Sequence, residues 1–175
     1  MNPPTKGHLY LLSKVLKEKA DRYILVLQGG NLQDKAFKNV FSQAIKEEII
    51  KASDLKGISK LEIVSGLMPH IPTIIESLGL DKETTEVVAT FGEEDIDKYR
   101  HQILEYPKMK LDGVIMKADT DNRISGTQVR NSIFENNFEE FMAQTGLEIE
   151  MFTKLRKEVL TNLENRFKGK KSQVS

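Results

Sequence analysis

The sequence predicts an α/β protein with a doubly wound parallel β-sheet, covered by helices on both faces, and with further helices at the C-terminus. Two observations predict this class. Short runs of apolar residues alternate along the chain with segments in which apolar residues recur every three to four positions, so that strands alternate with amphipathic helices. After the last such run, only helical patterns follow. In folds of this class, ligands bind beyond the carboxyl ends of the strands.

Each element follows from its own residues. Residues 23–27 are a continuous apolar run, typical of a strand that is buried on both faces. Residues 149–167 carry an apolar stripe from Phe152 to Phe167 at helical spacing. The expected strands are 23–27, 61–65, 86–91 and 111–117. The expected helices are 8–20, 40–52, 73–80, 93–104, 125–135, 138–144 and 149–167.

Length and composition limit the class of protein. A chain of 175 residues predicts one domain, here 1–145, with a C-terminal helix of the same domain at 146–168 and a disordered tail at 169–175. The 26 basic and 26 acidic residues balance, which argues against a partner that is a nucleic acid polymer but allows a local basic pocket. The absence of cysteine excludes disulfides, thiolate metal sites and a cysteine nucleophile. We expect a cytoplasmic protein without a signal peptide or membrane span.

A first candidate motif lies at residues 2–8, Asn-Pro-Pro-Thr-Lys-Gly-His. The two prolines favour an extended backbone, and Thr5 can then cap a helix. Gly7 lets a ligand approach the backbone, and His8 lies at the helix N-terminus, where free N–H groups favour phosphate. The alternative is a proline-rich loop with a helix cap and a surface histidine.

A second candidate motif lies at residues 123–130, Arg-Ile-Ser-Gly-Thr-Gln-Val-Arg. The hydroxyls of Ser125 and Thr127 stand at the start of a helix, and Arg130 follows one turn later on the same side as Gly126 and Thr127. Hydroxyls, free N–H groups and a guanidinium at one helix start form an anion site. The alternative is an ordinary serine cap with an exposed arginine.

Together the two motifs are more specific than either alone. The chain resembles the nucleotidylyltransferase superfamily, whose members carry an early T/H-x-G-H motif and a late I-S-x-T-x-x-R motif, here at residues 5–8 and 124–130. The resemblance covers about residues 1–145 and is greatest to phage-type and prokaryotic proteins related to nicotinamide mononucleotide adenylyltransferase. The Asn-Pro-Pro-Thr form of the first motif, the Gly92 turn before an acidic helix and the segment 136–141 support it.

The resemblance implies the transfer of AMP from ATP to a phosphorylated acceptor, most simply nicotinamide mononucleotide, with release of pyrophosphate. Mg²⁺ would be held chiefly by phosphate oxygens and water, without a metal site of the protein itself. The implied catalytic residues are Thr5, His8 and Arg130. The implied nucleotide-binding residues are Lys6, Gly7, Ser125, Gly126, Thr127, Gly92 and Asp95.

Weaker candidates follow two of the expected strands. Gln28, Gly29, Lys35 and Lys38 follow the first strand, at the sheet end where an acceptor phosphate would bind; a solvated loop is the alternative. For Asp95 the alternative is an acidic cap of the next helix. For Lys6 it is a solvated lysine.

Other functions share these motifs. A cytidylyltransferase, or an adenylyltransferase for an acceptor such as phosphopantetheine, would carry both of them. A non-catalytic descendant that binds nucleotide or serves as a structural module is the alternative of a different class. The apolar terminal helix leaves a homo-oligomer open.

The resemblance also implies a Rossmann-like sheet with strand order 3-2-1-4-5, whose first and central strand comes directly before the first motif. In this chain the motif begins at Asn2, so that strand has no counterpart. Leaving it out separates the other four strands into two pairs, with two spacings of ~4.8 Å between them. We expect the natural protein to start upstream; a rearranged sheet, or another segment in the gap, is the alternative.

Overall fold

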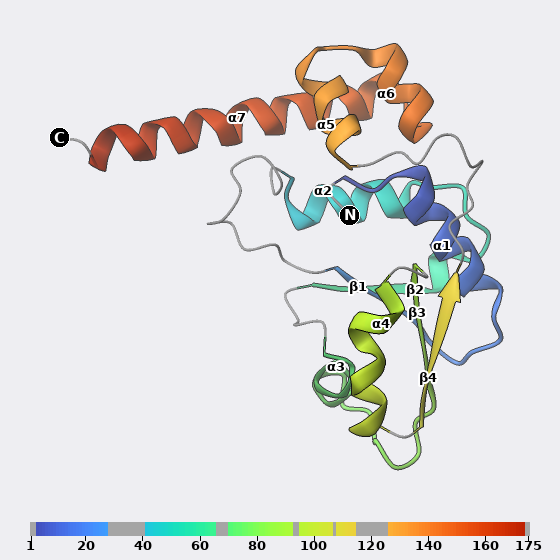
Figure 1. Ribbon diagram of the computed structural model, residues 1–175. Coiled ribbons are helices and arrows are strands. Elements are labelled where there is room, and N and C mark those ends of the chain that lie inside the picture. Colours follow the sequence, from blue (N-terminus) through green and yellow to red (C-terminus); the bar gives the residue numbers. More distant parts are fainter. Residues whose placement is uncertain are drawn as a thin grey trace. The chain divides into compact units, whose positions relative to one another are not determined.

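Helices and strands alternate along the chain in a computed structural model, which describes residues 3–27, 41–65, 70–92, 95–106, 108–114 and 126–173 (Figure 1). The strands are β1 (Tyr23–Leu27), β2 (Leu61–Ser65), β3 (Val87–Gly92) and β4 (Met109–Val114). The α-helices are α1 (Lys6–Lys17), α2 (Gln43–Lys51), α3 (Ile71–Ser77), α4 (Ile96–Tyr99), α5 (Gly126–Phe134), α6 (Phe138–Thr145) and α7 (Ile149–Gln173). Short 3-10 helices are η1 (Ile58–Lys60) and η3 (Arg100–Leu104).

The expected alternation is confirmed, and the protein is of the mixed α/β class. β1 and β2 have the bounds expected from the sequence. β3 is shifted by one residue toward the C-terminus, and β4 begins two residues earlier than expected. Residues 115–117 of the expected fourth strand lie outside the described residues.

The strands pair in parallel, as the alternation with helices predicts. β1 pairs with β2, with Tyr23 opposite Leu61, and β3 pairs with β4, with Val87 opposite Met109. A parallel pair needs a long crossover between its strands, and α2 lies in the first crossover and α4 in the second. The described strands form two separate two-stranded sheets, β1–β2 and β3–β4, and no continuous sheet.

The chain divides into two compact units. We call the first the helical unit; it comprises Met1–His8, Gly30–Ser53 and Arg123–Ser175. We call the second the sheet unit; it comprises Leu9–Gly29 and Asp54–Asn122. The helical unit thus combines the start of α1 with α2 and the three C-terminal helices.

The core of the helical unit joins α2 with the three C-terminal helices. Val129 of α5, Phe141 of α6 and Leu155 of α7 are fully buried in it, together with Ile49 of α2. The ring of Phe152 in α7 packs against that of Phe141, with 5.0 Å between the ring centroids. In Figure 1, α5 and α6 lie beside the first turns of α7. The spacing of these residues at one helical face explains why α5, α6 and α7 pack together.

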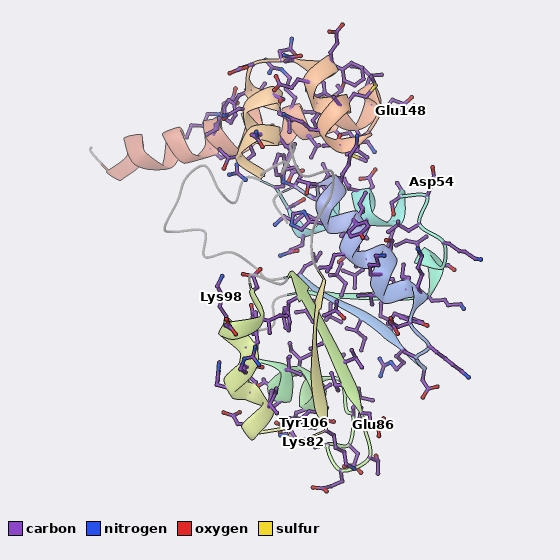
Figure 2. The ribbon with its side chains drawn as sticks, turned by 45° about the vertical axis from the view of Figure 1, so that its right-hand side comes forward. Asp54, Lys82, Glu86, Lys98, Tyr106 and Glu148 are labelled. Atoms are coloured by element: carbon purple, nitrogen blue, oxygen red, sulfur yellow. The ribbon has the colours of Figure 1, made fainter. Side chains whose placement is uncertain are left out.

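The sheet unit packs around Tyr106. This side chain is 2% exposed and lies in a cluster with Ile71 and Ile75 of α3 and partly buried residues of β3. Its hydroxyl donates a hydrogen bond to the carbonyl oxygen of Thr85. Figure 2 shows Tyr106 at the end of the unit that also carries Lys82 and Glu86.

The helix expected at 93–104 differs from the expectation. Residues 93 and 94 lie outside the described residues, and after the short α4 the backbone tightens into η3. Contacts with neighbouring elements account for the change. The Tyr99 ring stacks on Phe91 at 4.2 Å between centroids, and Gln102 accepts a hydrogen bond of 2.8 Å from the backbone N–H of Ile71. For so short a segment, such contacts outweigh helix propensity.

The C-terminal helix is longer than expected. Helix α7 continues to Gln173, so the segment 169–173, which we expected to be disordered, is helical. Lysine is a good helix former, and basic residues near a helix C-terminus interact favourably with the helix dipole. Lys168, in the last turns of the helix, meets both conditions.

The core of the helical unit gives a first prediction. Replacement of Phe141 by alanine leaves a cavity where a fully buried ring lay, so we expect F141A to lower the free energy of unfolding by about 3–5 kcal/mol. The neighbouring Met142 is 47% exposed, and M142A is the matched control with an expected change under about 1 kcal/mol. Urea unfolding followed by circular dichroism measures both. Equal effects of the two variants would contradict the assigned core.

Candidate functional site

The first motif is held in place by burial and by a local hydrogen-bond pair. Pro3 and Pro4 are fully buried, and Thr5 is 3% exposed. Thr5 directly precedes α1, and its backbone N–H donates to Nδ1 of His8 at 3.0 Å. The hydroxyl of Thr5 lies 2.9 Å from the same nitrogen. The third residue of α1 therefore bonds back to the residue before the helix, as the glutamate of a capping box does.

These contacts determine the protonation state of His8. A backbone N–H is only a donor, so Nδ1 must accept, and the neutral ring carries its proton on Nε2. Burial lowers the pKa of His8 to about 4. At neutral pH the side chain is therefore uncharged and presents Nε2–H as its donor. A donor of this kind can bind a phosphate oxygen.

The second motif begins α5. Gly126 is the first residue of this helix, and Thr127 follows with an exposed side chain. Nη2 of Arg130 donates to the hydroxyl of Thr127 at 3.0 Å, so the residues expected to act together are in contact. Arg130 is only 5% exposed, and burial lowers its pKa, although a guanidinium stays charged at neutral pH. Ser125 lies outside the described residues.

Both motifs belong to the helical unit. Residues of the first motif up to His8 and the described residues of the second share this unit, although four strands separate them in the sequence. The amino end of α5 adds the positive end of a helix dipole to the guanidinium of Arg130. This unit therefore contains a neutral donor, a buried cation and a helix N-terminus.

Lys46 was missed by the sequence analysis. This residue of α2 is 4% exposed, and burial lowers the pKa of its ammonium group, while the carboxylate of Glu158 in α7 opposes the shift. Among the described residues no hydrogen bond or ion pair within 4.0 Å is formed by its ammonium group. Its neighbour Ile45 belongs to the same core cluster as Val129, the neighbour of Arg130. The only sign of this burial in the sequence was the position of Lys46 beside the apolar stripe of its helix.

Lys6 is bound at a helix end. Its Nζ donates to the carbonyl oxygen of Ala143, in the last turn of α6, at 2.7 Å. Gly7, between Lys6 and His8, lies in the first turn of α1. Lys6 thus connects the first motif to a helix that packs against α5.

Gly92 and Asp95 belong to the sheet unit. Gly92 is the last residue of β3, and Asp95 directly precedes α4. The Asp95 carboxylate does not bond to the helix backbone; it accepts a hydrogen bond of 2.7 Å from Nζ of Lys98, which Figure 2 shows on α4. The expected acceptor-binding residues Gln28, Gly29, Lys35 and Lys38 lie outside the described residues.

Comparisons with known proteins do not assign the chain to a family. No model of a protein family matches the chain, and no curated protein matches it significantly. Within the described part of the chain, no helix combines the length and the apolar character that a membrane crossing requires.

The state of His8 gives a second prediction. The unfolded chain takes up a proton at the ordinary pKa near 6.5, whereas folded His8 takes it up only at about 4. The free energy of unfolding is therefore not reduced by His8 protonation above pH 6.5, and it decreases as the pH falls from 6.5 to 4, by on the order of 3 kcal/mol. We expect H8Q to reduce this loss and H101Q, at an exposed histidine, to leave it unchanged.

Urea unfolding at several pH values measures this loss, and the NMR titration of the His8 ring gives the pKa directly. A His8 pKa near 6.5 in the folded protein would contradict the assignment.

Proposed function

We propose that the protein is a nucleotidylyltransferase with a Rossmann-like fold that transfers AMP from ATP to a phosphorylated acceptor, with nicotinamide mononucleotide as the best candidate. One observation carries the proposal. The neutral donor His8 and the buried cation Arg130, each within a motif of the superfamily, belong to one compact unit. Membership of one unit is consistent with a common site for the two motifs.

The proposed reaction needs no nucleophile from the protein. An ionised phosphate oxygen of the acceptor attacks the α-phosphorus of ATP, and the bond to the bridging oxygen of the β-phosphate breaks. Pyrophosphate leaves with the electron pair of that bond. Negative charge increases on the α-phosphate and on the leaving group, so that the protein contributes positioning and electrostatic stabilisation.

His8 suits this reaction because its neutral ring donates a hydrogen bond through Nε2–H and does not need to take up a second proton. Its Nε2–H would bind a phosphate oxygen, while Thr5 fixes the ring through Nδ1. Such a donor gains strength as charge develops on the oxygen. A histidine with the ordinary pKa would instead be partly charged at neutral pH, and its donor strength would vary with pH.

Arg130 and Lys46 would supply the positive charge. Both are more than nine-tenths buried, and burial works against the charged form of each. The triphosphate of Mg·ATP would offset that cost, with its β- and γ-phosphates at the amino end of α5, where Gly126 and Thr127 lie. Mg²⁺ would arrive with the nucleotide, bound to its phosphate oxygens.

The pairing of the strands supports the proposed fold. In the order 3-2-1-4-5, the second and third strands are neighbours, and so are the fourth and fifth. If β1 is taken as the second strand, the observed pairs β1–β2 and β3–β4 are the neighbours that this order requires. The edges of β1 and β3 would then flank a central strand.

Turnover gives the third prediction. With Mg·ATP and nicotinamide mononucleotide, we expect pyrophosphate release that H8A and R130A each reduce by about 10²–10³-fold, the usual cost of one such donor. H101A, at an exposed histidine of the sheet unit, is the control and keeps its activity. Both variants should keep the circular dichroism of the wild type.

A panel of nucleotides and acceptors separates the alternatives. Pyrophosphate release only with CTP would identify a cytidylyltransferase. Release with ATP and phosphopantetheine would identify phosphopantetheine as the acceptor in place of nicotinamide mononucleotide. Tight nucleotide binding without release from any pair would identify a non-catalytic descendant. Full turnover by both H8A and R130A would refute the assigned residues.

Lys46 gives the fourth prediction. Because methionine fills a similar volume without a buried charge, we expect K46M to unfold at a higher temperature than the wild type while it binds tripolyphosphate about tenfold more weakly. K51M removes an exposed lysine from the same helix and should change neither property. Thermal unfolding and isothermal titration calorimetry measure the two effects. Unaltered tripolyphosphate binding by K46M would remove Lys46 from the site.

A further inference from the structure

The ammonium group of Lys6 donates a hydrogen bond to one backbone carbonyl group at the end of α6. Nζ donates to the carbonyl oxygen of Ala143 at 2.7 Å, between residues that are 137 positions apart in the sequence. In a helix this carbonyl would accept from the N–H four residues later, that of Leu147. The N–H of Leu147 donates to the hydroxyl of Thr145 instead, at 3.1 Å. Lys6 therefore bonds to a carbonyl that the end of the helix leaves open.

The end of α6 is shaped to receive this side chain. Gly146 follows the helix with φ of +73°, a left-handed conformation that suits glycine. A β-carbon at this position would lie 3.7 Å from Cε of Lys6, so the lysine stem lies against the glycine. The negative end of the α6 dipole favours an ammonium group at this place. Charge, hydrogen bond and packing therefore all hold Lys6 here.

The same turn of α6 is tied to the helix that carries Arg130. The hydroxyl of Ser132 in α5 donates to the side-chain oxygen of Gln144 at 2.9 Å, and both side chains are buried. Ser132 lies two residues after Arg130 on α5, and Gln144 directly follows Ala143 on α6. A short path thus runs from the first motif through Lys6 and the end of α6 to the second motif.

We propose that Lys6 is a positioning residue of the proposed reaction, which holds the start of α1 against α6 and so fixes His8 relative to Arg130. The hydrogen bonds between Thr5 and His8 tie the ring to the backbone that Lys6 anchors. This role differs from the one expected from the sequence, in which the ammonium group of Lys6 contacts the triphosphate. The kinetic part of this inference rests on the proposed function.

The two roles of Lys6 predict different kinetics. K6M keeps the stem and loses the donor, and K6R restores a donor and a charge. If Lys6 positions His8, K6M lowers kcat about tenfold and changes KM for Mg·ATP less than about twofold, because misplacement of a group acts on the reacting geometry. K6R recovers most of kcat. The control K14M, at another lysine of α1, leaves both constants unchanged.

Two kinetic outcomes overturn the proposal. A several-fold rise in KM for Mg·ATP with unchanged kcat would assign Lys6 to triphosphate binding. Unchanged kcat and KM would leave Lys6 without a role in the reaction.

A second measurement does not require turnover. We expect the pKa of His8, followed by NMR, to rise in K6M from about 4 toward 6.5, because the loosened start of α1 lets water reach the ring. In K6R and K14M it stays low. An unchanged His8 pKa in K6M overturns the positioning role even in an active enzyme. If the wild type releases no pyrophosphate with any substrate pair, the proposed function fails, and the His8 titration still decides whether Lys6 holds the motif.

Discussion

The helical unit has to keep two cationic side chains, Arg130 and Lys46, almost wholly away from water. Burial opposes the charged form of both, as the lowered pKa of each reflects. Ile45 and Val129, which directly precede Lys46 and Arg130 in the sequence, belong to the apolar core of the unit. In a medium of low dielectric constant, a bound polyanion interacts with such cations much more strongly than with exposed ones. The core and the two candidate cations therefore share helices α2 and α5.

The state of His8 complements these two cations. A third positive charge in the same unit would repel the other two, whereas a neutral imidazole donates a hydrogen bond without adding to their repulsion. Thr5 ensures this state, since its backbone N–H occupies Nδ1 and leaves the proton on Nε2. The prolines before Thr5 hold that N–H in place, because both are fully buried. The motif thus works through its backbone as much as through its histidine.

Much of the fold could be predicted from the sequence because apolar runs and helical stripes report burial directly. β1 and β2 have the predicted bounds, and every predicted helix has a counterpart. The break between α4 and η3 could not be predicted, since it follows from the contacts of Tyr99 and Gln102 with distant residues. An apolar run such as 23–27 does not reveal which strand lies beside it, so the division into two strand pairs was expected from the resemblance and not from the runs themselves.

The candidate site was predictable where local geometry determines it and unpredictable where tertiary packing does. The contact between Thr127 and Arg130 follows from their helical spacing, and the one between Thr5 and His8 from a helix start. Lys46 lies one turn before the buried Ile49 and Ile50, but this spacing alone does not tell a buried lysine from a solvated one such as Lys51.

The contact of Lys6 could not be predicted from the sequence either. Its charge suggested a phosphate, but Thr145 diverts the N–H of Leu147 and so leaves the Ala143 carbonyl open to an ammonium group. A lysine near an anion-binding motif can thus act on the helix that supports the site. Positive charge in the sequence identifies the anion-binding region. Backbone carbonyl groups that the fold leaves open, such as that of Ala143, determine which cations bind the protein itself and which can bind a ligand.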